Sequence, residues 1–280
     1  MSEHTLQKYH GLGNDFLLVR RGALPEEPEA VRRVCARHEG VGADGVLFWE
    51  EEADGVRMIL YNDDGSRPEM CGNGVRCLVA MLVDLGHLEA RSEVVVLSDA
   101  GPRPCTVRPG EAPGVHQVRV GMGRAVIPDA RRTCTVDGRT YTFTDVDMGN
   151  PHAVILEAPE DVTLEHVDRV GRWANEATDV FEAGVNVEFV SEAPDGALDV
   201  VVYERGVGRT QACGTGACAV AAAAWRAGLK PAGARVRVRL PGGVLEVEEG
   251  EGGAVVMTGP AVRVFGLTLD ERWMARMLAR

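Results

Sequence analysis

Two cysteines each begin a short glycine-rich step that leads into an apolar run. The two segments read "MCGNGVRC" at residues 70–77 and "ACGTGACA" at residues 212–219. The residues that follow predict helices over 75–86 and 217–228, both free of proline and both ending at a glycine suited to a helix C-cap. We therefore expect Cys71 and Cys213 to lie directly before a helix N-terminus.

A thiol in that position is chemically unusual. The free amides and the dipole of a helix N-terminus favour negative charge, which lowers the pKa of a thiol from about 8.5 towards the reactive range. The neighbouring glycines let backbone N–H groups approach a carboxylate closely. Two such steps, related by an approximate two-fold axis, would set two thiols on opposite sides of one carbon. One thiolate could then remove an α-proton while the other thiol returns one, which inverts the carbon without a prosthetic group.

The two segments belong to a longer internal echo at an offset of 142 residues. Identical residues recur in the same order: Tyr61 and Tyr203, Cys71 and Cys213, Gly74 and Gly216, and Gly86 and Gly228. The same offset sets Leu47 against Phe189, and a looser echo at an offset of 136 sets "GLGNDF" (11–16) against "DMGNPH" (147–152). We interpret the chain as two related halves.

Each half follows the same order of elements. Alternating or β-branched runs predict strands over 54–62, 92–99, 115–122, 139–148, 185–190, 198–204, 235–241 and 244–249. The two predicted helices are apolar on nearly every face, so each must be buried on every face. We therefore predict an α+β fold of two pseudo-symmetric domains, each a mixed β-sheet rolled like a barrel around a central helix.

The segment "RPGEAPG" (108–114) holds two prolines and two glycines, which favours a boundary between the halves. We expect an N-terminal half over 1–113 and a C-terminal half over 114–267. The tail over 268–280 has a helical period and is expected to pack back onto the first half.

The remaining cysteines have simpler interpretations. Seven cysteines without a secretion signal favour reduced thiols over a disulfide framework, and we expect five of them to be ordinary core residues: Cys35, Cys77, Cys105, Cys134 and Cys218. A zinc site is an alternative because 71/77 and 213/218 form pairs, although their spacing is poor for zinc and no histidine repeats with them. A thioredoxin-like site is disfavoured, since no C-x-x-C occurs.

The bulk composition narrows the class of partner. The chain has 280 residues and a formal net charge of −12, which argues against nucleic acid or an anionic membrane as a partner and leaves a small-molecule substrate. The start "MSEHTLQKYH" is polar where a signal peptide would be apolar, and the longest apolar run is too short to span a bilayer. We expect a cytoplasmic protein.

Four motifs together resemble the diaminopimelate epimerase family: "HGLGNDF", "YNDDGSRPEMCGNGVRC", "MGNPH" and "YERGVGRTQACGTGACA". The resemblance covers residues 8 to about 265. It implies a cofactor-independent epimerase of lysine and peptidoglycan precursor synthesis, without a metal, that interconverts LL-2,6-diaminopimelate and its meso isomer. It also implies a homodimer, and the family's fold agrees with the two rolled sheets predicted above.

The resemblance also assigns roles by position. It makes Cys71 and Cys213 the acid/base thiols, with Glu204 accepting from the reacting ammonium and His152 supporting catalysis. The reacting end of the substrate would be held by Asn14, Gly72, Asn73, Gly214 and Thr215. The distant amino-acid end would be held by Asn62, Asn150, Asn186 and Arg205. Gly45 departs from the pattern because some family members carry Gln there.

Other interpretations stay open on the sequence alone. A proline-type racemase or related isomerase could use the same thiol pair, and a non-catalytic or metal-binding protein could retain the fold. Taken singly, Asn14 and Asn150 are typical turn residues, a lone His152 is usually structural, and Glu204-Arg205 could be a solvated strand end. Arg205 and the extra asparagines suit a substrate with a second charged end, which favours the epimerase.

Overall fold

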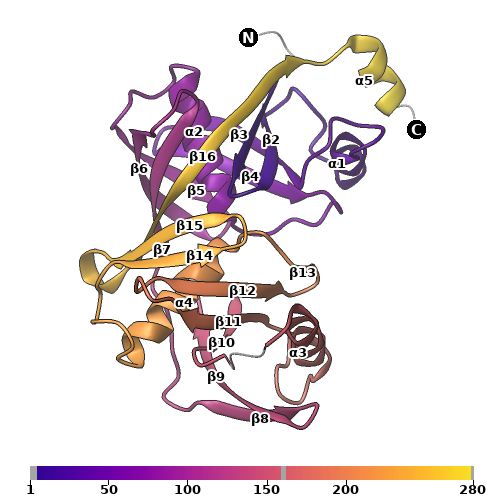
Figure 1. Cartoon of the computed structure of the whole chain (residues 1–280). Coiled ribbons are helices and arrows are strands. Elements are labelled where there is room, and N and C mark those ends of the chain that lie inside the picture. Colours follow the sequence, from indigo (N-terminus) through magenta and orange to yellow (C-terminus); the bar gives the residue numbers. More distant parts are fainter. Residues whose placement is uncertain (1–4, 159–161, 279–280) are drawn as a thin grey trace. The chain divides into compact units, whose positions relative to one another are not determined.

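The computed structural model describes residues 5–158 and 162–278 and divides the chain into two compact units (Figure 1). Unit 1 takes the residues up to Val120 and those from Gly259, and unit 2 takes Gly121–Thr258. The proline- and glycine-rich segment 108–114 lies inside unit 1, where it includes the turn between two antiparallel strands. Its composition suits a tight turn as well as a linker, which is why the expected boundary at 113/114 and the observed division differ.

Unit 1 is a mixed sheet whose strand order returns on itself. Its order is β1-β2-β3-β4-β5-β6-β7, and β16 neighbours both β7 and β1. The pairs β2–β3 and β4–β5 are parallel and the others for which a register is defined are antiparallel. The strands are β1 (Thr5–Gly11), β2 (Asn14–Arg20), β3 (Gly45–Glu52), β4 (Gly55–Asn62), β5 (Glu93–Ser98), β6 (Gly101–Pro109), β7 (Val115–Gly123) and β16 (Val255–Thr268).

Unit 2 repeats the sequence of strand pairings, but in its described residues the order ends at β8 and no pairing joins β8 to β16. Its order is β16-β15-β14-β12-β11-β10-β9-β8, with β10–β11 and β12–β14 parallel, and a short β13 pairs with β12. The strands are β8 (Arg132–Val136), β9 (Arg139–Asp147), β10 (Pro151–Ile155), β11 (Asn186–Glu192), β12 (Leu198–Glu204), β13 (Gly208–Arg209), β14 (Val236–Leu240) and β15 (Gly243–Glu249). The eight strands predicted from the sequence correspond to β4, β5, β7, β9, β11, β12, β14 and β15, within one or two residues at each end.

Each sheet wraps a central helix, α2 (Gly72–Asp84) in unit 1 and α4 (Gly214–Arg226) in unit 2. Every residue of α2 from Gly72 to Leu82 is buried, and α4 packs against β9, β10, β11, β14 and β15. Both helices are followed by the predicted glycine with a left-handed backbone, Gly86 at φ 75° and Gly228 at φ 74°. The structure therefore confirms an α+β fold of two mixed sheets, each rolled around a buried helix.

The strand registers correct one detail of the sequence echo. Val46 pairs with Tyr61 and Val187 pairs with Tyr203, so β3 and β11 correspond at an offset of 141 rather than 142. By the same registers Phe16 and Gly45 are partners, as are His152 and Asn186. Leu47 therefore corresponds to Glu188, not to Phe189, because the connection between β11 and β12 is one residue longer than the connection between β3 and β4.

Three further helices cover the sheets: α1 (Pro28–Cys35), α3 (Leu164–Glu176) and α5 (Glu271–Leu278), with a 3₁₀ turn, η1 (Glu251–Gly253), before β16. The tail contributes Leu269 and Met274 to the core cluster of unit 1, beside residues of α1. Of the five cysteines predicted to be core residues, Cys35, Cys77, Cys105 and Cys218 are buried and Cys134 is half-buried.

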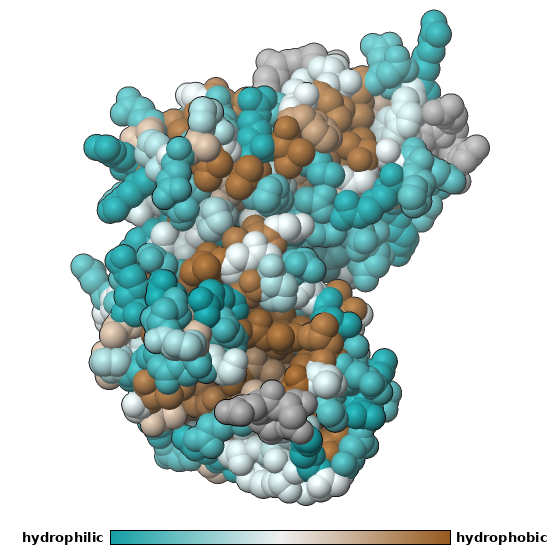
Figure 2. All heavy atoms as spheres, in the orientation of Figure 1, coloured by the Kyte–Doolittle hydropathy of each residue, from teal (hydrophilic) through white to brown (hydrophobic). Residues whose placement is uncertain are grey.

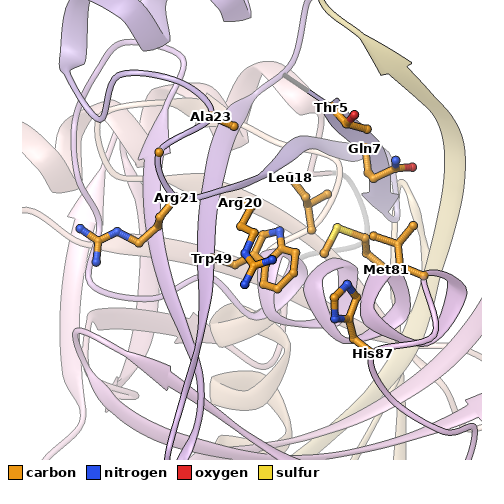
Figure 3. A pocket seen from close by; sticks show the side chains of 11 residues that line it. Thr5, Gln7, Leu18, Arg20, Arg21, Ala23, Trp49, Met81 and His87 are labelled. Carbon is orange, nitrogen blue, oxygen red and sulfur yellow. The ribbon is translucent and has the colours of Figure 1, made fainter. Parts of the chain in front are cut away.

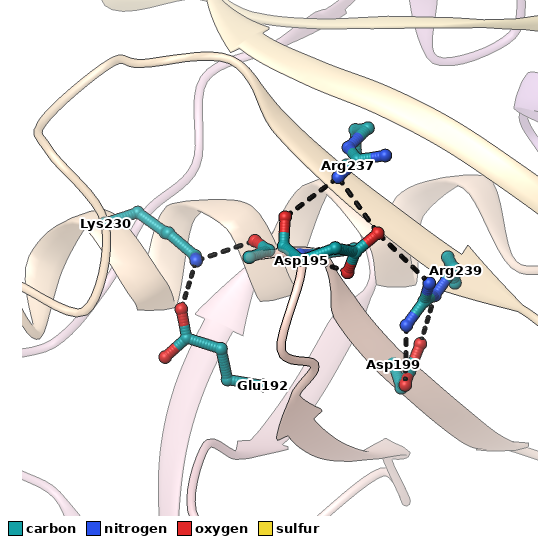
Figure 4. A network of polar contacts seen from close by, with 8 residues as sticks. Glu192, Asp195, Asp199, Lys230, Arg237 and Arg239 are labelled. Atoms are coloured by element: carbon teal, nitrogen blue, oxygen red, sulfur yellow. Dashed lines mark hydrogen bonds and ion pairs between the residues drawn. The ribbon is translucent and has the colours of Figure 1, made fainter.

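The visible surface is largely hydrophilic, with smaller hydrophobic areas between the polar side chains (Figure 2). One polar network lies on unit 2, where Arg239 pairs with Asp199 across the parallel strands β14 and β12 and also with Asp195 (Figure 4). Lys230 pairs with Glu192 in the same group. Exposed ion pairs of this kind contribute about 0–1 kcal/mol each. Among the described helices, none has the length and apolarity needed to cross a membrane.

Unit 1 also holds a cavity of about 440 Å³ near the C-terminal end of α2, away from Cys71 (Figure 3). Trp49 lies in its wall, with the guanidinium of Arg20 at 5.7 Å from the indole and the ring of His87 at 5.2 Å. None of the candidate site residues lines this cavity.

Candidate active site

The two cysteines singled out from the sequence are the N-cap residues of the two central helices. Cys71 has φ −141° and ψ 116°, and Cys213 has φ −119° and ψ 110°, so both are extended and the helix starts at the next glycine. Both positions agree with the prediction from the Cys-Gly step. The free N–H groups of the first helical turn therefore point towards the side of each helix on which its thiol lies.

In unit 1 the Cys71 thiol lies among amide side chains. Its Sγ donates to Asn14 Oδ1 at 3.9 Å, and Asn73 Nδ2 donates to the same oxygen at 3.1 Å. Asn14 stands at the start of β2 and Asn73 in the first turn of α2. The structure thus brings together Cys71, Gly72, Asn73 and Asn14, as the sequence predicted.

Charged groups hold these amides in place. Asn14 Nδ2 donates to Asp44 at 2.9 Å, and Asp44 in turn accepts from Arg37 at 2.6 Å. On the other side, Arg76 is fully buried and donates to Asn73 Oδ1 at 2.9 Å and to the Pro260 carbonyl at 3.1 Å. The orientation of both amide side chains is therefore set by a carboxylate on one side and a guanidinium on the other.

Asn62 and Gly45 lie at the facing ends of β4 and β3. Asn62 Nδ2 donates to Ser66 Oγ at 2.9 Å within the turn that follows β4. A side chain at Gly45 would place its Cβ 2.5 Å from the Tyr61 carbonyl oxygen. The backbone packing of this chain therefore leaves no room for a side chain at this position.

In unit 2 the Cys213 thiol is buried and lies close to two carboxylates. Its sulfur accepts from Gly216 N at 3.3 Å and contacts Thr215 Oγ1 at 3.5 Å. Burial raises the pKa of this thiol well above its ordinary value, and Glu204 and Glu188 raise it further, whereas the bonds from Thr215 and Gly216 lower it. The effect of the helix N-terminus expected from the sequence is present, but burial and the two carboxylates outweigh it, so Cys213 rests as a thiol.

Glu204 is the carboxylate at the end of β12, and the strand repeat makes it the counterpart of Asn62. It accepts hydrogen bonds from the Thr210 hydroxyl and from Cys213. Burial raises the pKa of Glu204, and the bond from Thr210 opposes that shift. A carboxyl group that shares hydrogen bonds with a buried thiol is well suited to accept from a substrate ammonium.

His152 reaches the same thiol through a line of side chains. His152 Nε2 donates to Asn150 Oδ1 at 3.1 Å, and Asn150 Nδ2 donates to Thr215 Oγ1 at 3.3 Å. On its far side, His152 Nδ1 lies 2.6 Å from Glu188 Oε1, and both side chains are fully buried. His152 therefore does not contact Cys213 directly but acts through Asn150 and Thr215.

Asn186 and Arg205 form a second group at the start of β11 and the end of β12. Asn186 Nδ2 donates to the Pro151 carbonyl at 3.2 Å, and its Oδ1 accepts from the backbone N–H of Arg205 at 2.8 Å. The Arg205 guanidinium donates to the Ala183 carbonyl at 2.9 Å. A cavity of about 960 Å³ within unit 2 is lined in part by Asn150, His152, Arg132, Phe181 and Ala183.

Three residues of these surroundings were not identified from the sequence: Glu188, Arg76 and Asp44. A signal was available for two of them. Arg76 is the one charged residue between Gly72 and Leu82 in a helix predicted to be buried on every face, and Glu188 stands between Val187 and Phe189 in an apolar strand. A charge in either place must have a partner. In the described part of the chain, no cluster of three or more His, Cys, Asp or Glu side chains is arranged to hold a metal ion.

Comparison with solved structures identifies the class of fold. The chain superimposes on a hydroxyproline epimerase from Agrobacterium vitis with a TM-score of 0.69 and 17% identity, covering 95% of this chain and 90% of that one. A phenazine biosynthesis protein from Bacillus anthracis gives a TM-score of 0.68 at 13% identity, with 95% and 98% covered. At these identities the likeness shows that the chain shares the fold of these proteins.

The family follows from the sequence comparisons. The model of the family described as diaminopimelate epimerase matches residues 6–128 and 144–264. The diaminopimelate epimerase of Desulforudis audaxviator is 44% identical over 95% of this chain and 98% of its own length. The enzyme of the same name from Synechococcus elongatus is 40% identical over 94% of this chain and 97% of its own. The chain belongs to the diaminopimelate epimerase family, a family of isomerases.

Proposed function

We propose that the chain interconverts LL-2,6-diaminopimelate and meso-diaminopimelate, with Cys71 and Cys213 as the two acid/base groups. One sulfur takes the α-proton as a thiolate, and the other, as a thiol, delivers a proton to the opposite face of the carbon. The carbon is inverted, one thiol and one thiolate remain with their roles exchanged, and no external proton donor or cofactor is consumed.

The helix N-termini are suited to the charge that develops in this reaction. As the C–H bond breaks, negative charge spreads onto the substrate carboxylate, where backbone N–H groups stabilise it. We assign Asn14, Asn73 and Thr215 together with Gly72 and Gly214 to the reacting end. Glu204 accepts from the α-ammonium, because it already accepts hydrogen bonds from Thr210 and Cys213.

The distant end of the substrate carries a second carboxylate and a second ammonium. We assign Arg205 to the carboxylate, since a planar guanidinium binds it in a bidentate fashion. Asn62, Asn150 and Asn186 then orient the ammonium. Asn186 supports Arg205 through its bond to the backbone N–H.

The observation that carries this proposal is the matched pair of N-cap cysteines on two buried helices of a repeated fold. The test is α-proton exchange in deuterated water, followed by NMR, with LL- and meso-diaminopimelate and no added cofactor. We expect deuterium at the α-carbon together with inversion for both isomers. Comparable exchange with L-lysine or L-proline at equal concentration would indicate a broad racemase instead.

We further propose a homodimer that works in the cytoplasm, in lysine and peptidoglycan precursor synthesis, with no nucleic acid or membrane partner. Val264 and Phe265 are neighbouring exposed apolar residues on β16, with exposed fractions of 49% and 37%, which suits a surface for a second copy. Light scattering coupled to size-exclusion chromatography tests the oligomeric state, and a mass of 30.0 kDa in solution would contradict it.

A further inference from the structure

Glu188 is a carboxylate in the interior of unit 2 to which the sequence assigns no function. It lies on β11 with an exposed fraction of 0%, and its only described side-chain partner is His152 Nδ1 at 2.6 Å. Within the described residues, its second oxygen, Oε2, has no hydrogen-bond partner. A buried carboxylate that is only half satisfied is costly to keep.

Unit 1 shows that the fold does not need an acid at this place. The strand registers make Leu47 the counterpart of Glu188 and Phe16 the counterpart of His152. Leu47 and Phe16 lie beside Gly74, the third residue after Cys71, and Glu188 lies beside Gly216, the third residue after Cys213. A Cβ at Gly74 would lie 3.2 Å from Leu47 and 3.9 Å from Phe16, and a Cβ at Gly216 would lie 2.8 Å from Glu188 Oε1. Two apolar residues lie against α2 where Glu188, paired with His152, lies against α4.

The acid is one end of a hydrogen-bonded line that ends on a thiol. From Glu188 the line runs to His152 at 2.6 Å, to Asn150 at 3.1 Å, to Thr215 at 3.3 Å and to Cys213 Sγ at 3.5 Å. Its five members come from three places in the chain: β11, the start of β10 with the residue before it, and the start of α4 with its N-cap residue.

The line has a direction. Asn150 donates its Nδ2 hydrogen to Thr215 Oγ1, so its Oδ1 must accept, and His152 Nε2 therefore carries a hydrogen. Between His152 Nδ1 and Glu188 Oε1 one further proton is shared, which leaves the pair neutral as a whole. Because Thr215 Oγ1 already accepts from Asn150, its hydroxyl hydrogen is free to point at the Cys213 sulfur. Together with Gly216 N–H, the sulfur then receives two donors.

We propose that Glu188 is a positioning residue for Cys213: by binding Nδ1 of His152 it fixes the ring and, through Asn150, turns the Thr215 hydroxyl towards the sulfur. Without the acid, Nδ1 is buried without a partner, the ring is free to turn, and the Asn150 amide can reverse. This inference rests on the proposed function only for its meaning in catalysis, since its effect on the thiol can be measured without substrate.

The test measures the rate at which iodoacetamide alkylates Cys213 in a Cys71→Ala background, between pH 7 and 10. Glu188→Leu copies the residue of unit 1 and leaves the net charge of the pair unchanged. We expect it to slow alkylation about tenfold at a given pH, which is the effect of one hydrogen bond to a charged group. Glu188→Gln keeps the volume of the side chain and one hydrogen bond to His152 Nδ1, so it should also slow the alkylation of Cys213, but by less than Glu188→Leu.

Two alternatives give different results. The charge of Glu188 raises the pKa of the Cys213 thiol, so its loss acts in the opposite direction; if that charge is the stronger effect, removal of Glu188 makes alkylation faster. If Glu188 has only a packing role, the rate does not change. Either result overturns the proposal.

A double-mutant cycle shows whether the line itself transmits the effect. Thr215→Val removes the hydroxyl and keeps the shape, so we expect Glu188→Leu to cause little further change in that background, whereas additive losses would contradict the proposed route. Phe189→Leu is the matched control, because Phe189 follows Glu188 on β11 and packs in the hydrophobic core cluster that contains Tyr141 and Phe143. This variant should change the melting temperature but not the alkylation rate.

If the wild-type chain shows no exchange with diaminopimelate, the proposed function fails, but the alkylation result for Glu188 stands by itself. If exchange is present, Glu188→Leu should lower kcat about tenfold with little change in KM, because the lost hydrogen bond acts on the thiol and not on substrate binding.

Discussion

The surroundings of Cys71 in unit 1 and of Cys213 in unit 2 share one backbone plan and differ in their side chains. Each thiol caps a helix of 13 residues inside a rolled mixed sheet. Around Cys71 the nearby polar groups are two asparagines, with the buried cation Arg76 behind one of them. Around Cys213 they are Thr215, Glu204 and Glu188.

This difference separates the binding of an anion, which both units can provide, from the environment of each sulfur, which differs between the units. The helix N-termini and their glycines supply backbone donors in both places, so anion binding belongs to the repeated part. The side chains beside the two sulfurs do not repeat. Burial and two carboxylates raise the pKa of the Cys213 thiol, whereas the groups near Cys71 are asparagines with a guanidinium behind one of them.

The largest effect should come from removing either thiol. Cys71→Ala and Cys213→Ala should each lower epimerisation by about a thousandfold or more, because inversion needs one group to remove a proton and another to donate one. The double variant should be hardly worse than either single variant. NMR of deuterium exchange together with inversion measures this. Cys218→Ala, which is buried on the same helix as Cys213, is the control and should remain active.

Near-normal turnover in either single variant would remove the two-thiol mechanism. If the Cys218→Ala control lost activity while its melting temperature was preserved, the loss in Cys213→Ala would no longer identify Cys213 as an acid/base group.

The next effect should come from the residue that binds the distant end of the substrate. Arg205→Lys should lower kcat/KM by about a hundredfold, since a single ammonium does not replace a bidentate guanidinium. The matched control is Arg209→Lys, on the neighbouring strand, where the arginine pairs with Asp168 at 2.7 Å. Steady-state kinetics with LL-diaminopimelate would decide between them, and equal losses would show that Arg205 has no special role.

A smaller effect tests the difference between the thiols directly. At pH 7 without substrate, iodoacetamide should modify Cys71 about ten times faster than Cys213. Cys213 is only 5% exposed, and burial together with Glu204 raises its pKa, which keeps its thiolate scarce at pH 7. Peptide mass spectrometry after timed labelling reads both sites in one sample. Equal rates would mean that the carboxylates of unit 2 do not control the reactivity of its thiol.

The smallest effect concerns the first residues of two equivalent strands. Gly45 begins β3 where Asn186 begins β11, and a Cβ at Gly45 would meet the Tyr61 carbonyl at 2.5 Å. Gly45→Ala should therefore destabilise the protein by about 1–3 kcal/mol through local crowding. Chemical denaturation measures this cost. A Gly45→Gln variant that is more stable than the wild type would show that β3 and β4 can separate to accept the side chain.

The fold could be predicted from the sequence because its main signals are local. The Cys-Gly step, the apolar helix that follows and the closing glycine are contiguous, and so are the alternating strands. The line from Glu188 to Cys213 could not be predicted in this way, since its members come from three separate places in the chain and a glutamate in a strand is usually solvated. The one-residue difference in offset at β11 also concealed that Glu188 is the counterpart of Leu47.

Arg76 was missed for a related reason. Its helix was correctly predicted to be buried, but the groups that receive its hydrogen bonds include the Pro260 carbonyl, 184 residues further along the chain. The roles of the polar site residues came from resemblance, because an isolated asparagine or histidine carries no such information.

The split composition of unit 1 has a consequence for how the molecule is made. Unit 2 is one continuous stretch, Gly121–Thr258, whereas unit 1 lacks β16 beside β1, and lacks Leu269 and Met274 in its core, until the chain from Gly259 onward has been synthesised. On the ribosome, the part of unit 1 that is made first therefore has an unpaired sheet edge and an incomplete core until unit 2 has been translated. The order of translation and the order of completion are reversed: the part that begins first closes last.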